Sequence, residues 1–379
     1  MEYKKLGDFC NITSSKRIFA EQYVSEGIPF YRSKEIIEKN NNQNISEPLF
    51  ISKETYETIK EKFGVPKEND ILLTSVGTLG IPYIVKNETF YFKDGNLTWL
   101  KDFKKELNQK YLYYWLSSKF GYKSLTLRAI GSSQPALTID ILKKYKLFIP
   151  PLPTQQKIAT ILSAYDNLIQ NYKKQIEALQ TAASELYKEW FVRFRFPGYQ
   201  TNRFENGIPE EWKIERLTKL VEIKYGKDHS KLDDGNIPVY GSGGIMRYCN
   251  KALYDKETVL IPRKGSLNNI MYANRPLWTV DTMFYSIMLR KNLAKYLYYV
   301  LSKIDMESFN AGAALPSMTT EILSHFKIIV PDNEILESFD KKIALIFTQI
   351  DNLQQQITNL TQQRDLLLPR LMSGKLGVE

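Results

Sequence analysis

The sequence predicts an α+β protein in which two tandem α/β domains are each followed by a long helix. Three observations predict this architecture: segments that recur in the same order, short β-rich runs in each copy, and a heptad pattern of apolar residues after each set of runs. The chain has 379 residues, of which 43% are hydrophobic and 25% are charged. This length and composition suit two to three domains with hydrophobic cores of their own.

The internal repeat rests on several matched segments. Residues 111–117, YLYYWLS, recur as residues 296–302, YLYYVLS. Residues 131–150, GSSQPALTIDILKKYKLFIP, recur as residues 312–331, GAALPSMTTEILSHFKIIVP. Shorter matches join residues 28–31 to 237–240, residues 70–80 to 258–268, and residues 166–167 to 351–352. The same order at every place indicates two copies of one unit, related by a pseudo-two-fold axis.

Each copy is predicted to hold one α/β domain and one helix. The domains are residues 1–150 and 196–331, in which runs such as IPFYRS, ILLTSV and TFYFKD alternate with Gly, Asn and Pro. A central spacer helix is expected in residues 151–195, and a C-terminal spacer helix in residues 332–379.

Both helices carry an apolar seam with heptad spacing. Thr154 is the expected N-cap of the first helix, after Pro151 and Pro153. The apolar positions then alternate in steps of four and three. They are Ile158, Leu162, Tyr165, Ile169, Tyr172, Ile176, Leu179, Ala183, Leu186 and Trp190 in the first helix, and Leu336, Phe339, Ile343, Ile346, Ile350, Leu353, Ile357, Leu360, Leu367 and Leu371 in the second, where Arg364 breaks the seam.

The seams predict that the two helices pair as an antiparallel coiled coil. One helix over residues 154–190 would be about 55 Å long and could not bury such a stripe against itself. Packing of each helix on its own domain is the alternative. The antiparallel direction is favoured because the chain leaves the first helix, builds a second domain and returns. Two similar basic domains held roughly 50 Å apart would suit two contacts along one face of B-DNA.

Composition and motifs exclude several classes of protein. The net charge is +10, which is weak support for a polyanionic partner and equally fits ordinary solubility. Two cysteines, Cys10 and Cys249, and two histidines, His229 and His325, build neither a disulfide framework nor a zinc site. Phosphate-binding GxxxxGK[ST] and GxGxxG motifs are absent from the sequence. No apolar run reaches about 18 residues, so a cytoplasmic location is expected.

Candidate DNA-binding residues lie in loops that differ between the copies. Arg and Lys can hold phosphates or read guanine, and Gln can read adenine. The alternative for each residue is a solvated surface group. Divergent loops on a repeated frame suggest two different half-sites. The candidates are Lys16, Arg17, Arg32, Lys34, Arg128, Ser132, Ser133 and Gln134 in the first copy, and Lys227, His229, Tyr240, Ser242, Arg263 and Lys264 in the second.

Several segments resemble the specificity (S) subunit of type I restriction-modification systems, the HsdS family. Residues 149–169, IPPLPTQQKIATILSAYDNLI, look like the entry to the central helix of that family. Residues 190–199, WFVRFRFPGY, and 207–217, GIPEEWKIERL, look like its junction into the second recognition domain. Residues 367–376, LLPRLMSGKL, look like its C-terminal ending.

The resemblance implies a non-catalytic DNA-recognition subunit. Residues 1–150 and 196–331 would be target-recognition domains, each reading one half of an asymmetric bipartite target in double-stranded DNA, and the helices would set the gap. Two M (modification) subunits would methylate adenine N6 with S-adenosylmethionine, and R (restriction) subunits would use ATP and Mg²⁺ for translocation and cleavage. This chain would hold no catalytic residue, cofactor or metal of its own, and no membrane partner is implied.

Large apolar side chains are expected to dock an M subunit, because aromatic residues dominate interface energetics. The candidates are Trp190, Phe191, Phe194, Leu367 and Leu371, whereas packing is favoured for Tyr165 and Tyr172. Under this hypothesis, replacing Phe191 or Phe194 by Ala weakens co-purification of M and leaves the isolated fold intact.

Three classes of function remain open at this point. A specificity subunit would act mainly within a complex that contains M, and a silent specificity cassette would resemble it in sequence. A stand-alone bipartite DNA-binding scaffold would bind its site without M. A self-sufficient nuclease would cut DNA with a divalent metal alone, and it has the least support because no acidic motif recurs in both copies.

Overall fold

The computed structural model describes residues 3–41, 43–131, 135–310 and 317–378. The chain divides into two compact units: unit 1 is Met1–Tyr172 with Gln356–Glu379, and unit 2 is Lys173–Gln355. The two long helices are α6 (Leu152–Tyr187), which continues into a π turn at Lys188–Val192, and α10 (Asn333–Met372). The unit boundaries fall inside these helices, so each helix contributes one segment to each unit.

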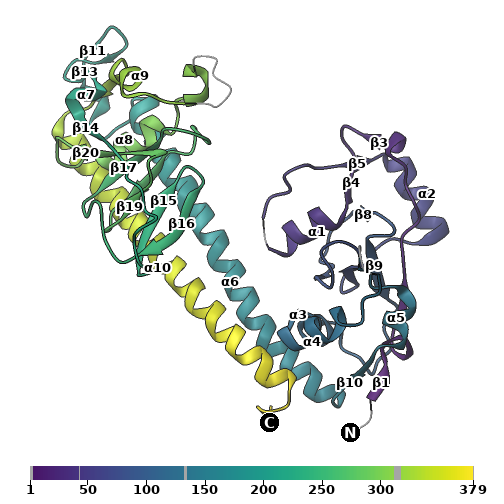
Figure 1. The fold of residues 1–379 in the computed structure, drawn as a ribbon. Coiled ribbons are helices and arrows are strands. Elements are labelled where there is room, and N and C mark those ends of the chain that lie inside the picture. The colour runs from purple at the N-terminus through teal and green to yellow at the C-terminus, as the bar shows by residue number, and fades with distance from the viewer. Residues whose placement is uncertain (1–2, 42, 132–134, 311–316, 379) are drawn as a thin grey trace. The chain divides into compact units, whose positions relative to one another are not determined.

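Unit 1 is a domain of mixed helices and strands (Figure 1). Its central four-stranded antiparallel sheet has the order β2-β9-β6-β7. A second sheet has the order β3-β5-β4-β8, and β1 pairs with β10. The strands are β1 (Tyr3–Lys5), β2 (Asn11–Thr13), β3 (Tyr23–Val24), β4 (Ile28–Tyr31), β5 (Phe50–Ile51), β6 (Ile71–Thr74), β7 (Pro82–Ile84), β8 (Tyr91–Phe92), β9 (Leu97–Lys101) and β10 (Lys146–Phe148). The helices are α1 (Ser33–Asn40), α2 (Lys53–Phe63), α3 (Gln109–Ser117), α4 (Lys119–Thr126) and α5 (Ile139–Lys144), with 3-10 turns at Leu6–Asp8 and Ala20–Gln22.

Unit 2 has a central antiparallel sheet of order β14-β20-β17-β18 and a smaller sheet of order β16-β15-β19. The strands are β11 (Phe204–Glu205), β12 (Ile208–Pro209), β13 (Lys213–Arg216), β14 (Val221–Tyr225), β15 (Ile237–Gly241), β16 (Gly244–Cys249), β17 (Thr258–Pro262), β18 (Met271–Ala273), β19 (Trp278–Thr279), β20 (Met283–Met288) and β21 (Lys327–Val330). The helices are α7 (Leu217–Leu220), α8 (Ala294–Leu301) and α9 (Thr320–Ser324), with 3-10 turns at Tyr199–Thr201 and Met306–Phe309.

The two units share one strand topology. In the central sheets, β14-β20-β17-β18 repeats β2-β9-β6-β7. Strands β15 and β19 pair in parallel, as β4 and β8 do, and the β13–β21 ladder repeats the β1–β10 ladder. The predicted internal repeat and the α+β fold class are therefore confirmed.

Matched helix caps show how repeated sequence builds repeated structure. The hydroxyl of Thr138 caps α5 and accepts a hydrogen bond from the backbone N–H of Ile141 at 3.3 Å. The hydroxyl of Thr319 caps α9 and accepts one from the N–H of Ile322 at 3.2 Å. Both threonines occupy the same position in the repeat, and each satisfies a donor that a helix start leaves free.

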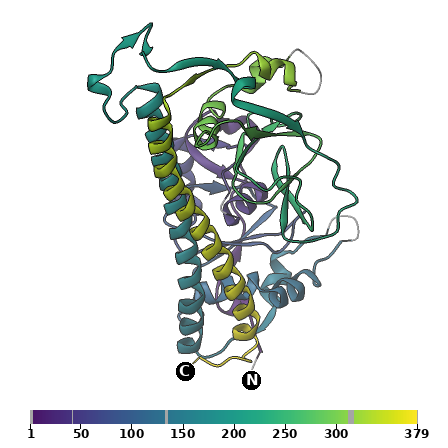
Figure 2. The same cartoon turned by 90° about the vertical axis from the view of Figure 1, so that its left-hand side faces the viewer.

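Segments of α6 and α10 lie side by side within each unit (Figure 2). In unit 1, Ile158 of α6 belongs to the same buried cluster as Leu371 of α10. Further along α6, Asp166 forms an ion pair with Arg364 of α10 at 2.6 Å. Residue numbers thus rise along α6 in the direction in which they fall along α10, so the two segments run antiparallel.

The same pairing occurs in unit 2. There Trp190, in the π turn that ends α6, and Phe339, near the start of α10, have ring centres 5.9 Å apart. Ala183, Tyr187 and Ile343 are buried in the same cluster. The long helices thus pair as an antiparallel coiled coil within each unit. They also pack on the adjoining domain, so helix–helix pairing and helix–domain packing, which the sequence offered as alternatives, occur together.

The start of α6 differs from the prediction. The helix begins at Leu152 and not after an N-cap at Thr154. Pro153 fits the first turn because no intrahelical partner exists there for the N–H that proline lacks. Instead, the buried side-chain amide of Gln155 donates to the carbonyl oxygens of Glu106 at 2.9 Å and Pro150 at 2.8 Å, which ties the first turn to the domain.

Asp340 takes the place of Gln155 in the second copy. It also ties its long helix to the adjoining domain, but through an ion pair. The Lys295 ammonium lies 2.9 Å from Asp340 and 2.5 Å from Glu257, so it joins α8 and α10 to the segment before β17. Lys295 is nearly buried, and such a charge needs close partners to be tolerated. Among the described residues, no helix is both long and apolar enough to cross a membrane.

Candidate nucleic-acid interface

Three loops of unit 1 leave the central sheet at the same end. Strands β2 and β6 end there, at Thr13 and Thr74, and β9, which lies between them, begins there at Leu97. Because neighbouring strands are antiparallel, the loops that follow β2 and β6 meet the loop that precedes β9. We define the loop edge of unit 1 as residues 14–17, 75–81 and 93–96.

Hydrogen bonds hold these loops together. The N–H of Gly95 donates to the hydroxyl of Ser14 at 3.5 Å, and the N–H of Ser75 donates to the carbonyl oxygen of Asn96 at 2.8 Å. The N–H of Leu137 donates to the carbonyl oxygen of Ser75 at 2.9 Å, which joins the segment after α4 to the same edge.

Unit 2 repeats this edge. Strands β14 and β17 end at Tyr225 and Pro262, and β20 begins between them at Met283. Backbone hydrogen bonds again connect the loops: the N–H of Lys227 donates to Thr279 at 2.8 Å, and the N–H of Arg263 donates to Thr282 at 2.8 Å. The loop edge of unit 2 is residues 226–231, 263–270 and 280–282.

Lys16 and Arg17 lie on the loop edge of unit 1 and are exposed. The Arg17 guanidinium pairs with Asp94 of the neighbouring loop at 2.7 Å. The backbone N–H of Lys16 donates to the hydroxyl of Tyr91 at 2.7 Å, and its ammonium lies 5.3 Å from the centre of the Phe63 ring. The structure thus brings two of the predicted residues together on a positioned loop.

Arg32 and Lys34 lie next to the edge, since the hydroxyl of Ser33 donates to the carbonyl oxygen of Asn96 at 3.3 Å. Their charges are balanced by carboxylates. Arg32 lies 2.5 Å from the buried Glu35, and Lys34 lies 3.1 Å from Glu47. The hydrogen bonds that the Arg32 guanidinium donates to the Glu35 carboxylate raise the pKa of Arg32 against a smaller opposing effect of burial. These two cations therefore add less net positive charge than the sequence suggests.

Arg128 is exposed in the segment after α4, and its guanidinium lies 5.1 Å from the centre of the Tyr145 ring. The three predicted base readers that follow it, Ser132, Ser133 and Gln134, lie outside the described residues.

In unit 2, Lys227 is exposed at the start of the loop edge. Its carbonyl oxygen accepts a hydrogen bond from the indole of Trp278 at 2.9 Å, which anchors the loop. His229 is half-buried, and its Nδ1 atom is buried with no hydrogen-bond partner among the described residues. The neighbouring Asp228 accepts from the hydroxyl of Ser230 at 2.6 Å, and this bond lowers the pKa of the Asp228 carboxyl.

Arg263, Lys264 and Ser242 also meet at this edge. Lys264 is exposed, and the carbonyl oxygen of Ser242 accepts a bond from the side chain of Asn269 at 2.8 Å. Arg263 lies 5.3 Å from the centre of the Tyr225 ring. The sequence did not predict Tyr225 or Asn269 as site residues, although Tyr225, the last residue of β14, takes the place in the strand register that Ser14 takes just after β2.

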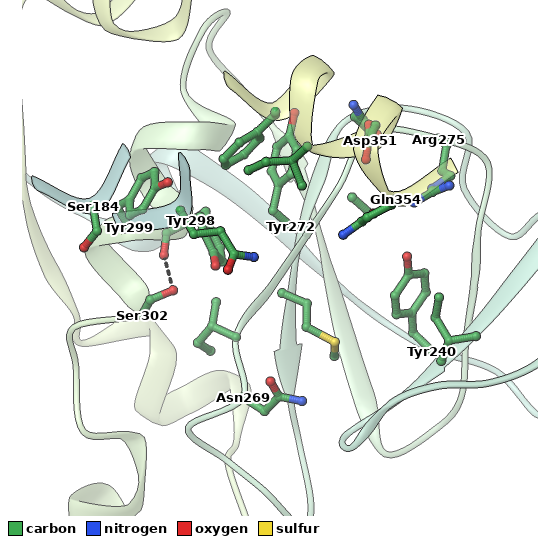
Figure 3. Close-up of a pocket in the computed structure, with 18 of the residues that line it drawn as sticks. Ser184, Tyr240, Asn269, Tyr272, Arg275, Tyr298, Tyr299, Ser302, Asp351 and Gln354 are labelled. Carbon is green, nitrogen blue, oxygen red and sulfur yellow. Dashed lines mark hydrogen bonds between the residues drawn. The ribbon is translucent and has the colours of Figure 1, made fainter. Parts of the chain in front are cut away.

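Tyr240 does not belong to the exposed edge, because only 7% of it is exposed and its side chain faces a cavity (Figure 3). The cavity has a volume of about 620 Å³. Tyr272, Tyr298, Arg275 and Asp351 also line it. Tyr240 is therefore poorly placed to read a base directly, and its contribution to the edge is the backbone that leads to Ser242.

Tyr31 and Tyr113, the counterparts of Tyr240 and Tyr298 in unit 1, contact α1. The Lys39 ammonium lies 5.0 Å from the ring of Tyr31 and 5.8 Å from the ring of Tyr83, and Tyr113 donates to the side chain of Asn40 at 3.2 Å. Unit 2 has strand β16 where unit 1 has α1, and the cavity lies among the corresponding tyrosines. The two copies thus differ in structure as well as in side chains near their edges.

Two of the predicted docking residues, Trp190 and Phe191, are buried, with 5% and 6% of the residue exposed. The Phe191 ring lies 4.7 Å from that of Tyr296 and 4.8 Å from that of Phe339. Contrary to the hypothesis made from the sequence, we therefore expect that replacing Phe191 by Ala destabilises the fold, because this side chain is part of the core of unit 2. Phe194 is half-buried against the same core.

The docking residues on α10, Leu367 and Leu371, belong to unit 1. Leu371 is 3% exposed, and Leu367 is half-buried beside it. Both line an apolar groove of about 650 Å³ together with Thr160 and Ile161 of α6 and Val378. Docking at any of these positions stays a prediction. Within the described residues, no cluster of three or more His, Cys, Asp or Glu could hold a metal.

Comparison with known families identifies the family of a chain that carries these two repeated loop edges. The model of the type I restriction modification DNA specificity domain matches residues 1–181 and again residues 209–366. The chain belongs to this family. As a specificity subunit of a type I restriction-modification system, it is a DNA-recognition component and not an enzyme.

Relatives of this specificity subunit match half of the chain or more. The type I restriction enzyme MjaIX specificity subunit of Methanocaldococcus jannaschii is 27% identical over 354 residues, covering 82% of this chain and 78% of the relative. A putative type I specificity subunit of Haemophilus influenzae is 32% identical over 195 residues, covering 50% of this chain. The crystal structure of the S subunit from M. genitalium superposes with a TM-score of 0.63 at 20% identity, covers 98% of this chain and 95% of that one, and shows the same fold.

Proposed function

We propose that this specificity subunit directs its complex to an asymmetric bipartite DNA target, with one half-site read by the loop edge of each unit. The observation that carries the proposal is a repeated edge with different side chains. Thr13 of β2 and Lys224 of β14 pair with the third residues of β9 and β20. A lysine, Lys16 or Lys227, stands three residues after each of them, but the next residue is Arg17 in unit 1 and Asp228 in unit 2. One backbone frame thus presents two chemical surfaces.

The shared and the divergent residues suit different tasks. A lysine at the same place in both edges can hold a phosphate, which positions the duplex without reading sequence. Side chains that differ between the edges, such as Arg17 and Arg263, can form hydrogen bonds to base edges, and a bidentate arginine contact favours guanine. Different side chains on the same backbone framework predict that the two units read different half-sites, and hence that the target is asymmetric.

The proposed partners are two M subunits and R subunits. An internal repeat offers two similar surfaces, so two copies of one partner can bind the chain with local pseudo-two-fold symmetry. Adenine N6 methylation, with S-adenosylmethionine bound by M, and cleavage, with ATP and Mg²⁺ bound by R, would then take place on those subunits. We further propose that α6 and α10 set the gap between the half-sites.

The direct test is single-molecule methylation sequencing of DNA from cells that express this chain with its M subunit. We expect N6-methyladenine at one split, asymmetric motif, and we expect it to disappear when this chain is omitted. A symmetric motif would contradict two different half-sites. If M fails to co-purify while the isolated chain binds a specific site, the chain is a stand-alone DNA-binding scaffold. If M co-purifies and no motif is methylated, the chain is a silent copy.

A further inference from the structure

We propose that α4 and the turn after it form a fourth DNA-contacting element in unit 1, with no equivalent among the described residues of unit 2. The inference rests on the proposed function and concerns the duplex of the half-site that unit 1 reads. The element is an exposed surface formed by Lys119, Tyr122, Lys123, Leu127 and Ile130, which we name the α4 surface.

The α4 surface is continuous with the loop edge of unit 1. A Cβ atom placed on Gly80, in the loop after β6, would lie 3.4 Å from the ring of Tyr122. At the other end of the surface, Ile130 and Ala136 exchange two backbone hydrogen bonds of 3.0 and 2.8 Å, and Ala136 forms a β-bridge with Val76 of the same loop. A duplex that contacts this loop therefore also meets the α4 surface.

The apolar members of the surface are unusually open to water. Leu127 is 75% exposed and Ile130 is 57% exposed, although the neighbouring Leu125 is fully buried. Apolar side chains that gather beside a binding site commonly mark a contact surface. On DNA, such side chains contact thymine methyl groups in the major groove or wedge between base steps in the minor groove.

The charge of the segment favours DNA over a protein partner. Residues 107–139 contain four Lys or Arg residues and no Asp or Glu. Lys119 and Lys123 are one helical turn apart on the exposed side of α4, a spacing that lets both ammonium groups reach the same phosphate backbone. A protein partner generally offers mixed charges, whereas an acid-free cationic surface matches a polyanion.

The corresponding segment of unit 2 provides an internal contrast. Residues 292–320 hold Asp305 and Glu307, both exposed. Asp305 accepts a hydrogen bond from the side chain of Asn268 at 3.1 Å, so an acidic group lies beside the loop after β17, where Tyr122 lies beside the loop after β6 in unit 1. These carboxylates would repel phosphates, and the fourth element is therefore confined to unit 1.

The test uses the full chain in its complex with M. Fluorescence anisotropy would measure binding to a duplex that carries the methylated motif and to a duplex of scrambled sequence, over a range of salt concentrations. The variants are Lys119→Ala with Lys123→Ala, and Leu127→Ser with Ile130→Ser. The matched control is Lys104→Ala with Lys105→Ala, which removes two exposed lysines just after β9 at the opposite end of the sheet. Thermal unfolding would verify that each variant is folded.

The two double variants should lose DNA affinity in different ways. Loss of the two lysines should weaken binding to both duplexes by about ten-fold near 0.1 M salt and reduce the slope of log K against log salt by about two. Loss of the apolar pair should weaken binding to the motif duplex alone by about ten-fold, and relax the methylated motif in one half only. The control should match the wild type.

Three other outcomes would overturn the inference, and they are distinguishable. If the wild type prefers its motif and both variants behave like the control, the α4 surface has no role in DNA binding and the proposed function stands. If the variants keep their DNA affinity but lose co-purification with M, the surface is a protein interface. If the wild type shows no preference for its motif, the proposed function itself fails.

Discussion

Arg364 has a partner that the sequence alone does not reveal. It is the single polar interruption of the second apolar seam, and its guanidinium pairs with Asp166, which lies 198 residues away in the chain. The hydroxyl of Tyr114 donates to the same carboxylate at 2.6 Å. The three polar groups satisfy one another at the packed face of unit 1. No local pattern reveals such a contact, because it depends on the pairing of α6 with α10.

Replacing Arg364 by Leu should lower the free energy of unfolding by about 1–2 kcal/mol, because the half-buried Asp166 would keep its charge and lose a partner. The double variant Arg364→Leu with Asp166→Leu should recover part of this loss, because apolar side chains then continue the seam. Urea unfolding of the single and double variants measures the coupling. Strictly additive losses would show that the pair does not interact.

Two buried groups of unit 1 make its stability sensitive to alkaline pH. Burial raises the pKa of the Cys10 thiol from 9.0 to about 12, and burial raises the pKa of Tyr111 from 10.0 to about 12. Between the ordinary and the raised values, the folded state holds more protons than the unfolded state. The stabilisation is therefore complete below about pH 9 and is lost progressively as the pH rises to about 12.

These two groups should accordingly leave the free energy of unfolding unchanged up to about pH 9 and lower it above that pH, by about 1.4 kcal/mol per pH unit for each group at most. The urea midpoint of the chain, measured across this range, should fall in the same way. In addition, Cys10 should resist alkylation near pH 8 until the chain unfolds, because the thiolate is the reactive form. Rapid labelling of Cys10 in the native protein, or a midpoint that rises above pH 9, would contradict this account.

The end of α6 is an element whose burial the sequence did not predict. Sequence reasoning favoured Phe191 as a docking residue because it follows the seam, but the π turn at Lys188–Val192 places both Trp190 and Phe191 in the core of unit 2. Sequence periodicity did not reveal this, because the seam ends here and burial depends on α8 and α10, which come much later in the chain.

Phe191→Ala should therefore lower the free energy of unfolding by about 3–5 kcal/mol, the usual cost of truncating a buried phenylalanine. Phe194→Ala, at a half-buried position, should cost clearly less and serves as the comparison. Thermal and urea unfolding measure both. An unchanged unfolding profile for Phe191→Ala, together with lost co-purification of M, would contradict this expectation and support the docking hypothesis.

The elements that sequence predicts best are those specified by local patterns. The heptads predict the positions of α6 and α10, and the repeat predicts two matched domains. The predicted start of α6 lies too late in the chain, because Pro151 and Pro153 are expected to precede the helix, which begins at Leu152. The candidate site was predicted in part: Lys16, Arg17, Lys227 and Arg263 lie on the loop edges, whereas Arg32 and Lys34 are balanced by carboxylates and Tyr240 is buried. These differences depend on tertiary neighbours such as Glu35 and Glu47, which no spacing rule identifies.

For the whole molecule, the proposed role of the long helices makes a specific prediction. Deleting about seven residues, one heptad, from each of α6 and α10 should shorten the gap between the half-sites and leave the half-sites themselves unchanged, because removal of a full heptad preserves the seam. Methylation sequencing of cells that express the shortened chain with M measures the gap. Altered half-sites at an unchanged gap would contradict the proposed role of the helices.

The central claim is that each loop edge reads its own half of the target. The most direct test compares the methylated motifs of two variants, Lys16→Ala with Arg17→Ala in unit 1 and Arg263→Ala with Lys264→Ala in unit 2, by single-molecule sequencing alongside the wild type. We predict that each variant relaxes or loses the base preference in one half of the motif, that the two variants affect different halves, and that the gap stays constant. Changes confined to the same half in both variants, or no change in either, would contradict the claim.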